Sequence, residues 1–514
     1  MTARLGSVVA AVCVLPACPQ ALASNDFVYH VFVRSFADAA SDRGANGQIG
    51  DLRGLRENLD YINDGRPGKG SDLEAGILWL MPIFPTGTYH GYDIEDYRAV
   101  NPEYGTLQDL RDLVQEAHRR GVRVILDIAF NHTSNRHPWF LEAVKNPASR
   151  YRKFYVMEPA EGQARSRRWR AVGSLRYFAP FSDRMPELNL DDPAVRTEVK
   201  AIAKFWLDQG IDGFRLDAAK HAFDDGEGEF TEEEVRKNND WWREFCDFVY
   251  SVKADAVLVG EVLGRPDMLR RHARGFDALL DDPFLDAARE YIAAPRPGLL
   301  RAWLDWVRGY RQANGRGRFE PWVFLGSHDR TPRLASFLEQ RAAGRVEEAY
   351  RLGMYLLFSV ARFPVMYSGD ELMQRGVKWP NDGSRVYDET LREPFPWFAS
   401  GTSKPPQTGW FAPRYDKPND GVSVEEQGRR GGMLDLVRRL SRLRVQYPEF
   451  ATGDIDAVLA DDAEWLVFTK GRYLVQIRAM GVGSAYRLPQ AWRKARVVFR
   501  SDDSRFVVME RSPL

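Results

Sequence analysis

Three acidic residues, Asp217, Glu261 and Asp329, each follow an apolar stretch of the sequence. The stretches read GFRLDAAKH, VGEV and FLGSHD, and a fourth, DIAFNH at residues 127–132, has the same character. If these stretches are parallel strands of a barrel, their carboxyl ends share one rim and the three acids meet in one pocket. Two carboxyl groups whose pKa values are held apart can act on one bond, one as the proton donor and the other as its charged partner.

Arg215 lies two positions before Asp217, so both side chains would share one face of a strand. The guanidinium group could then hold the carboxylate ionised and oriented. Gly213 would leave room for a neighbouring backbone to approach closely. An Arg/Asp pair at a strand end is also an ordinary structural ion pair. Four matching strand ends favour a functional site over that alternative.

Apolar runs bounded by turn residues occur in the order that an eight-stranded barrel requires. Helical patterns lie between them, and two, at residues 107–121 and 195–210, end in a glycine that closes a helix. Strands that alternate with helices form a parallel sheet, so the predicted fold class is α/β, a (β/α)8 TIM barrel. The eight predicted strands are residues 27–33, 75–84, 122–131, 211–218, 256–262, 276–281, 320–329 and 363–371.

Two further modules are expected beside the barrel, which takes residues 24–131 and 190–450. The gap at residues 132–189 is too long for an ordinary connection after strand three, so we expect an inserted small domain there. Short strand-like runs in residues 451–514 predict a C-terminal antiparallel β domain. A second long segment, residues 372–428, follows strand eight and should lie on the rim that carries the acids.

The four stretches resemble, in the same order, the sequence regions of the α-amylase family of glycoside hydrolases. MPELNLDDP (185–193) is similar to the segment that this family carries just before its fourth strand. HGYDIEDY (90–97) is similar to its sugar-stacking loop, and LREPFPW (391–397) resembles a stretch of some oligosaccharide-cleaving members. The resemblance extends over residues 27–450, and the joint pattern is far more specific than any single piece.

The resemblance implies a role for each acid. Asp217 corresponds to the nucleophile, and we expect Arg215 to depress its pKa so that it stays charged. Glu261 corresponds to the general acid and then base, with a pKa raised by desolvation and nearby negative charge. Asp329 corresponds to the third acid, which binds ring hydroxyls and favours the distorted sugar of the transition state.

Further residues are expected to bind substrate by the same resemblance. Tyr92 and His132 would line the subsite of the sugar whose bond breaks, and His328 would act beside Asp329. Lys220 and His221 would face the leaving-group side, a pair more similar to α-amylases than to α-glucosidases. Loop packing remains an alternative for Tyr92, and surface charge remains one for Lys220.

Calcium is the metal that the resemblance implies. Asn131 matches a calcium position of the family at the junction with the inserted domain, but a carboxylate partner is not evident between residues 181 and 191. The loop ASDRGANGQIGD keeps only Asp42, Asn46 and Asp51, spaced too loosely for an oxygen cage. Chloride activation is not expected, because Gly326 and Ser327 precede His328 where many members carry an Asn. We expect no zinc site and no organic cofactor.

The beginning of the chain predicts export. Arg4, an apolar run and an Ala-Leu-Ala sequence ending at Ala23 indicate a signal peptide over residues 1–23, and so a secreted or periplasmic protein. Processing before Cys18 would instead give a lipid anchor. Cleavage after Ala23 leaves Cys246 as the remaining cysteine, so no intrachain disulfide is possible.

Composition limits the partners. The formal net charge of +0 offers no basic field for nucleic acid or an anionic membrane, so neutral substrates fit better. We expect no transmembrane segment and a monomer.

The sequence therefore predicts a retaining α-glucan hydrolase that cleaves α-1,4-glucosidic bonds of starch or maltodextrins, with an oligosaccharide or polysaccharide as substrate. An exo-acting α-glucosidase would use the same acids but cleave at the end of the substrate chain. A 4-α-glucanotransferase would use the same acids but transfer the glucan to another acceptor. A barrel that binds glycans without catalysis is a third reading, which the retention of all three acids disfavours.

Overall fold

The computed structural model describes residues 26–42, 47–161, 166, 168–224, 229–317, 319–379, 387–402, 404–428, 431–479 and 485–511. The predicted signal peptide, the alternative lipid anchor at Cys18 and Asn46 of the loop after the first strand lie outside these residues. Among the described helices, none combines the length and the apolar character needed to cross a bilayer.

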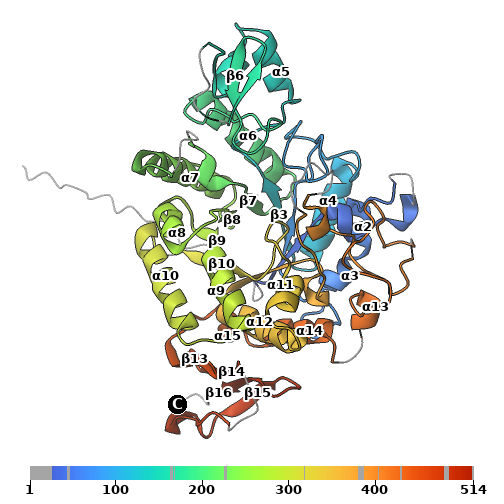
Figure 1. The fold of residues 1–514 in the computed structure, drawn as a ribbon, viewed down its shortest axis with the longest axis vertical. Helices are drawn as coiled ribbons and strands as arrows, with labels where there is room; N and C mark the ends of the chain where they lie inside the picture. Colours follow the sequence, from blue (N-terminus) through green and yellow to red (C-terminus); the bar gives the residue numbers. More distant parts are fainter. Residues whose placement is uncertain are drawn as a thin grey trace, which may run out of the picture.

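Eight parallel strands close into a barrel, in the order β1-β11-β10-β9-β8-β7-β3-β2 (Figure 1). Each observed strand lies within one of the eight predicted segments, so the predicted fold class is confirmed. The strands are β1 (Val28–Val31), β2 (Ile77–Leu80), β3 (Arg123–Ile128), β7 (Gly213–Leu216), β8 (Val257–Gly260), β9 (Ala278–Leu280), β10 (Glu320–Phe324) and β11 (Phe363–Tyr367).

Apolar side chains fill the barrel, which is why its strands read as continuous hydrophobic runs rather than alternating ones. The interior cluster includes Trp79, Val259, Trp322 and Phe324, all buried. Gly213 pairs with Val257 of β8, and a Cβ at this position would overlap the carbonyl oxygen of Val257. The predicted close backbone approach at Gly213 is therefore present.

Helices cover the outside of the barrel (Figure 1). In α4 (Leu107–Arg119), Thr106 and Asp109 form a capping box that starts the helix, and the apolar positions at three- and four-residue spacing are buried. The other helices of this layer are α2 (Leu52–Glu57), α3 (Leu59–Ile62), α6 (Pro193–Asp208), α7 (Glu232–Val252), α8 (Pro266–His272), α9 (Asp282–Ala293), α10 (Leu299–Asn314), α11 (Leu334–Arg341), α12 (Val346–Val360) and α14 (Met433–Gln446).

A small domain is inserted between β3 and β7, at the top of Figure 1. It contains α5 (Pro138–Lys145) and a three-stranded antiparallel sheet of β4 (Met157–Pro159), β6 (Leu175–Phe178) and β5 (Trp169–Val172). The chain that leaves β3 pairs with the chain that returns, since Leu188 N–H donates to Asn131 O and Thr133 N–H donates to Pro186 O. These bonds fix the inserted domain to the barrel rim.

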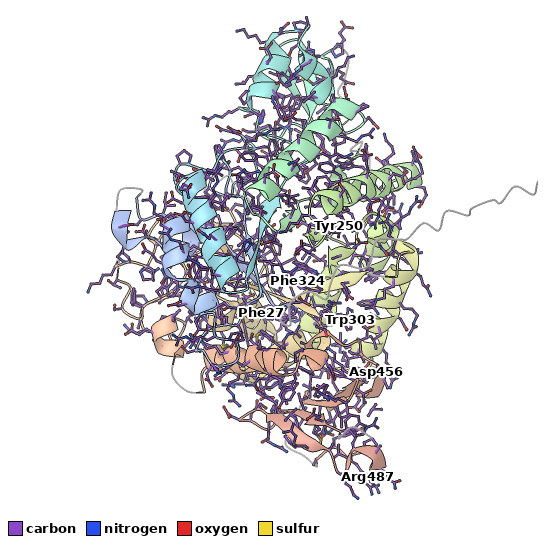
Figure 2. The ribbon with its side chains drawn as sticks, turned by 180° about the vertical axis from the view of Figure 1, so that it is seen from behind. Phe27, Tyr250, Trp303, Phe324, Asp456 and Arg487 are labelled. Atoms are coloured by element: carbon purple, nitrogen blue, oxygen red, sulfur yellow. The ribbon has the colours of Figure 1, made fainter. Side chains whose placement is uncertain are left out.

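A five-stranded antiparallel sheet ends the chain, at the opposite end of the molecule from the inserted domain (Figure 1). Its strands are β12 (Ala457–Asp461), β13 (Trp465–Lys470), β14 (Tyr473–Arg478), β16 (Phe506–Glu510) and β15 (Arg496–Arg500). Tyr355 of α12 stacks on Phe506 with ring centroids 5.1 Å apart. Figure 2 shows Asp456 and Arg487 in this distant module, with Phe324 inside the barrel. The sheet therefore supports the barrel from the far side.

The long segment after β11 packs on the segment that follows β1. Phe395 N–H and Thr408 Oγ1 both donate to Ser35 O, and Trp397 Nε1 donates to Phe36 O. Because the residues after β1 lie at the carboxyl ends of the strands, these bonds hold the long segment at the rim, where its position in the sequence predicted it.

Candidate active site

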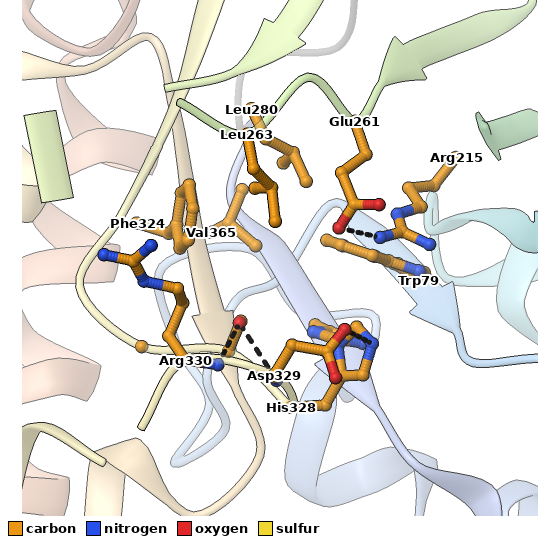
Figure 3. A pocket seen from close by; sticks show the side chains of 13 residues that line it. Trp79, Arg215, Glu261, Leu263, Leu280, Phe324, His328, Asp329, Arg330 and Val365 are labelled. Atoms are coloured by element: carbon orange, nitrogen blue, oxygen red, sulfur yellow. Dashed lines mark hydrogen bonds and ion pairs between the residues drawn. The ribbon is translucent and has the colours of Figure 1, made fainter. Parts of the chain in front are cut away.

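A pocket, partly open to solvent, lies at the carboxyl ends of the barrel strands. Glu261, His328 and Asp329 line it, together with Arg215 from β7 and Trp79 from β2. In Figure 3, Glu261 and Arg215 lie over Trp79 on one side, and Asp329 and His328 lie on the other. The pocket therefore receives polar groups from strands that are far apart in the sequence.

Arg215 joins three carboxyl groups below this pocket. Its Nη1 donates to Asp127 Oδ1 at 2.6 Å and to Asp217 Oδ1 at 2.5 Å. Its Nη2 forms an ion pair with Glu261, drawn as a dashed line in Figure 3. Arg215 is completely buried, so its charge is poorly screened and each of these contacts is strong.

Burial raises the pKa of Asp217 above its usual value, although the charge and hydrogen bond of Arg215 oppose the shift. Arg215 thus acts in the expected direction, but desolvation outweighs it and the expected net depression is absent. Burial also raises the pKa of Glu261, and the negative charges of Asp217 and Asp329 add to the rise. The upward shift expected for Glu261 is therefore present.

Asp329 has a different set of partners. Arg392 Nη2 donates to its Oδ1 at 2.8 Å, and His328 Nε2 lies 2.9 Å from its Oδ2. Burial alone would raise the pKa of Asp329, but His328 and Arg392 together hold it well below the usual value. Burial lowers the pKa of His328 itself to about 4. At neutral pH His328 is therefore uncharged, and Arg392 and Lys378 are the cations that favour the ionised form of Asp329.

Tyr92 lies between these two groups of acids. Its hydroxyl donates to Asp127 Oδ2 at 3.0 Å and lies 2.6 Å from His328 Nε2, and its ring stacks on that of His328. Trp79 Nε1 donates to the same Asp127 oxygen at 3.1 Å. Asp127 is thus a fully hydrogen-bonded anchor under the pocket, and Tyr92 is held rigidly by its partners rather than by loop packing alone.

The remaining predicted residues lie on the side of the inserted domain. His132 Nε2 lies 3.1 Å from Tyr92 O, and its ring faces Phe181 at 5.3 Å. The ring of His221, in the turn after β7, faces Phe181 at 5.2 Å. Lys220 Nζ donates at 2.8 Å to the carbonyl oxygen of Leu263, a residue that lines the pocket. Lys220 is therefore half-buried and held by a backbone carbonyl, rather than a free charge at the surface.

Asn131 is buried at the junction with the inserted domain, and Glu187 lies beside it. His132 and Glu187 form a β-bridge, Asn131 and Glu187 are both buried, and the side chain of Asn131 is a hydrogen-bond partner that favours the charged form of Glu187. Burial raises the pKa of Glu187 well above its usual value. Glu187 is thus a buried carboxylate beside Asn131 that the sequence did not single out. Among the described residues, no three His, Cys, Asp or Glu side chains gather as a metal site.

The family follows from comparison with known proteins. The model of the α-amylase catalytic domain matches residues 30–453, most of the chain. The chain belongs to the α-amylase family. It is therefore an enzyme of the glycoside hydrolase class, and the predicted resemblance is confirmed.

Relatives within this α-amylase family differ in activity. Alpha-amylase 3 of Dictyoglomus thermophilum is 35% identical over 86% of this chain and 82% of its own length. A 4-alpha-glucanotransferase of Thermotoga neapolitana is 30% identical over 78% of this chain and 83% of its own length. The crystal structure of an alpha-amylase from H. orenii superposes with a TM-score of 0.76 at 31% identity, covering 95% of this chain and 97% of that one.

Sequence reasoning missed three residues that the structure places in or beside the site. Asp127 was visible in DIAFNH, but its role as a shared acceptor depends on the barrel register. Arg392 was visible in LREPFPW, but its contact with Asp329 spans 63 residues. Phe181 belongs to no recognisable sequence motif. It is 43% exposed and lies between His132 and His221, and both facts depend on the folded structure.

Proposed function

We propose that this α-amylase family member hydrolyses α-1,4-glucosidic bonds of starch or maltodextrins with retention of anomeric configuration. The observation that carries the proposal is the contact of one guanidinium, that of Arg215, with both Asp217 and Glu261. Retaining cleavage requires the nucleophile and the acid to be close together, about 5–5.5 Å apart, without room for a water between them. A guanidinium bonded to both carboxyl groups keeps them near each other.

Asp217 would attack the anomeric carbon while Glu261 protonates the departing oxygen. The glycosyl–Asp217 ester would then be hydrolysed by a water that Glu261 deprotonates. The raised pKa of Glu261 suits a group that must start the cycle protonated. Its Oε2 accepts a hydrogen bond from Ala218 N–H at 2.9 Å, which fixes the carboxyl group next to the nucleophile.

Asp329 would remain ionised and accept hydrogen bonds from ring hydroxyls of the sugar whose bond is cleaved. Tyr92, which stacks on His328, and His132 would line the same subsite, and Phe181 would contact the sugar on the leaving-group side. Because Arg392 and His328 hold Asp329, its oxygens are oriented before substrate arrives.

The test is the stereochemistry of the product. Proton NMR of maltoheptaose hydrolysis, recorded within the first minutes, should show the α-anomer of the new reducing end. Glu261→Gln should lose most turnover and Asp217→Asn should lose nearly all of it. Initial release of the β-anomer, or undiminished turnover by Glu261→Gln, would refute the mechanism.

Exo-acting α-glucosidase or 4-α-glucanotransferase activity is a second candidate, favoured by one observation. Residues 387–393 close against the pocket, where Asp388 accepts hydrogen bonds from both Arg392 and Tyr89. Such a closure would let the pocket hold only the non-reducing end of a substrate chain. Maltoheptaose blocked at its non-reducing end separates the readings, because an exo-acting enzyme cannot begin on it, whereas an endo-acting enzyme cleaves it.

We further propose that calcium binds at the junction of barrel and inserted domain. Asn131 and Glu187 would supply oxygen ligands, and both side chains are buried at this junction. A hard cation there would compensate the buried carboxylate and tie the two modules together. A chelator should lower the unfolding temperature of the wild type but not that of Glu187→Gln. Equal effects on both proteins would contradict the site.

We also propose that residues 1–23 direct export and that the protein is a monomer. The mature amino terminus is expected at Ser24, which mass spectrometry of the secreted protein would check. Sedimentation should give one copy of the chain per particle.

A further inference from the structure

Large apolar side chains exposed to solvent are uncommon, and in the described part of the chain the aromatic ones are Phe181, Trp379 and Tyr387. Phe181 lies beside His132 and His221 of the candidate active site. Trp379 and Tyr387 lie in the long segment after β11, on the same rim. Exposed apolar side chains that gather at one opening indicate a binding surface.

Trp379 and Tyr387 are held together, and a cation lies over each ring. Trp379 N–H donates to Tyr387 O at 2.8 Å. The guanidinium of Arg414 lies 4.1 Å from the Trp379 ring centroid, and Lys378 Nζ lies 5.4 Å from that of Tyr387. Despite these contacts, Trp379 is 36% exposed and Tyr387 is 45% exposed. Two fixed aromatic rings thus remain available to an outside ligand.

This aromatic pair is joined to the acids. Lys378 N–H donates to Thr331 Oγ1 at 2.8 Å, and Thr331 is two residues beyond Asp329. The loop that carries Tyr387 continues into Asp388, which accepts a hydrogen bond from Arg392, the partner of Asp329. The negative charges of Asp329 and Glu261 both act on Lys378. The pair therefore lies at the mouth of the same pocket.

We propose that Trp379 and Tyr387 form a stacking platform for a glucosyl unit beyond the one whose bond is cleaved, so that the enzyme favours longer α-glucan chains. This inference rests on the proposed function. A glucose ring has an apolar face that packs on an aromatic ring, and hydroxyl groups at its edge that accept hydrogen bonds from an ammonium or guanidinium group. Lys378 and Arg414 provide such donors beside the rings.

A protein partner is the competing occupant of this surface. The platform is small, it is flanked by cations, and it continues into a pocket that is lined by acids, all of which suit a chain of sugars better than a broad apolar interface. A partner would also leave the dependence of turnover on substrate length unchanged.

The test compares substrate lengths. For wild type, Trp379→Ala and Tyr387→Ala, kcat/KM is measured on maltotriose and on maltoheptaose. The ratio of kcat/KM on maltoheptaose to kcat/KM on maltotriose should fall about 2- to 12-fold in each variant, the range expected for one aromatic stacking contact. Trp379→Phe should recover part of the ratio, because it keeps an aromatic face. Leu141→Ala, which removes an exposed side chain from the inserted domain, is the control and should leave the ratio unchanged.

Binding gives a second measurement that does not depend on turnover. Calorimetry with maltoheptaose should show weaker binding to Glu261→Gln/Trp379→Ala than to Glu261→Gln alone. An unchanged length ratio together with equal binding would overturn the platform while leaving the proposed function intact. A wild type that cleaves neither substrate would instead refute the proposed function itself.

Discussion

Replacing Arg392 by Met tests how the third acid is held. Arg392 is 2% exposed, and it donates to Asp329 Oδ1 at 2.8 Å, to Asp388 Oδ2 at 2.9 Å and to His328 O at 3.1 Å. Removing one partner of a buried ion pair costs about 3–5 kcal/mol. The side chain of Asp329 is 33% exposed and keeps His328, so we expect the lower end, about 3 kcal/mol.

The same change should alter the pH dependence. Arg392 helps to hold the pKa of Asp329 below its usual value, so the stabilisation from this contact is present above the unfolded pKa of about 4 and is lost as the pH falls through the folded pKa. Without Arg392, one of the groups that lower the pKa of Asp329 is lost, so this pKa rises. The acidic limb of the kcat/KM profile should then move to higher pH, with a loss of about 10²-fold at the optimum as Asp329 loses its orientation.

Urea unfolding and a pH series of kcat/KM measure the two effects. Arg392→Lys keeps the charge but cannot reach three acceptors, so it should give an intermediate loss. Arg341→Met, which removes an exposed pair with Glu290, should cost less than about 1 kcal/mol and leave the profile in place. If Arg392→Met behaves like Arg341→Met in both measurements, Arg392 does not hold the acid as we infer.

Three further changes have defined outcomes. Gly213→Ala should lower the unfolding temperature by several degrees, because its Cβ would overlap Val257 O and force β7 and β8 apart; an unchanged temperature would contradict the strand register. Substituting Leu263, a half-buried residue that lines the pocket two positions after Glu261, by Asp should move the basic limb of kcat/KM to higher pH, because added negative charge raises the pKa of that acid further; a limb that stays in place would argue against Glu261 as the acid. Burial lowers the pKa of Lys470 to about 7, so the unfolded state binds more protons above that pH and the stability of the wild type should rise from pH 7 to 10. Lys470→Met should lack this rise, which urea unfolding at a series of pH values would show.

The strand ends could be predicted because their signal is local. An apolar run followed by Asp217, Glu261 or Asp329 is visible within a few residues, and the barrel geometry then brings the runs together without further information. Tyr92 and His132 were expected from the family resemblance of short motifs that follow strands.

Other parts of the site depend on contacts that no local pattern encodes. Glu187 was visible in MPELNLDDP, but its meeting with Asn131 depends on the pairing of the two chain segments that border the inserted domain. Arg392 comes from a segment rich in Pro and Gly, where periodicity predicts no position. The net pKa shift of Asp217 depends on the balance between burial and one guanidinium, and only the folded structure sets that balance.

The two arginines divide the charge of the site unequally. Arg215 is shared by Asp127, Asp217 and Glu261, so one positive charge faces three acids, whereas Arg392 faces Asp329 and Asp388. Three carboxylates around one buried cation leave excess negative charge. This charge favours the binding of one proton by Asp127, Asp217 or Glu261.

Hydrogen bonding indicates which acid carries the proton. Burial raises the pKa of Asp127 to about 7, but Asp127 accepts hydrogen bonds from Trp79, Tyr92 and Arg215, and all three favour its ionised form. Glu261 has two such partners, Arg215 and Ala218 N–H, and it faces the pocket. The proton is therefore best placed on Glu261, the acid that faces the substrate. Carboxyl-stretch infrared difference spectra of the wild type and Glu261→Gln at pH 6 should show the loss of a protonated-carboxyl band, and a band that persists would place the proton on Asp127 or Asp217 instead.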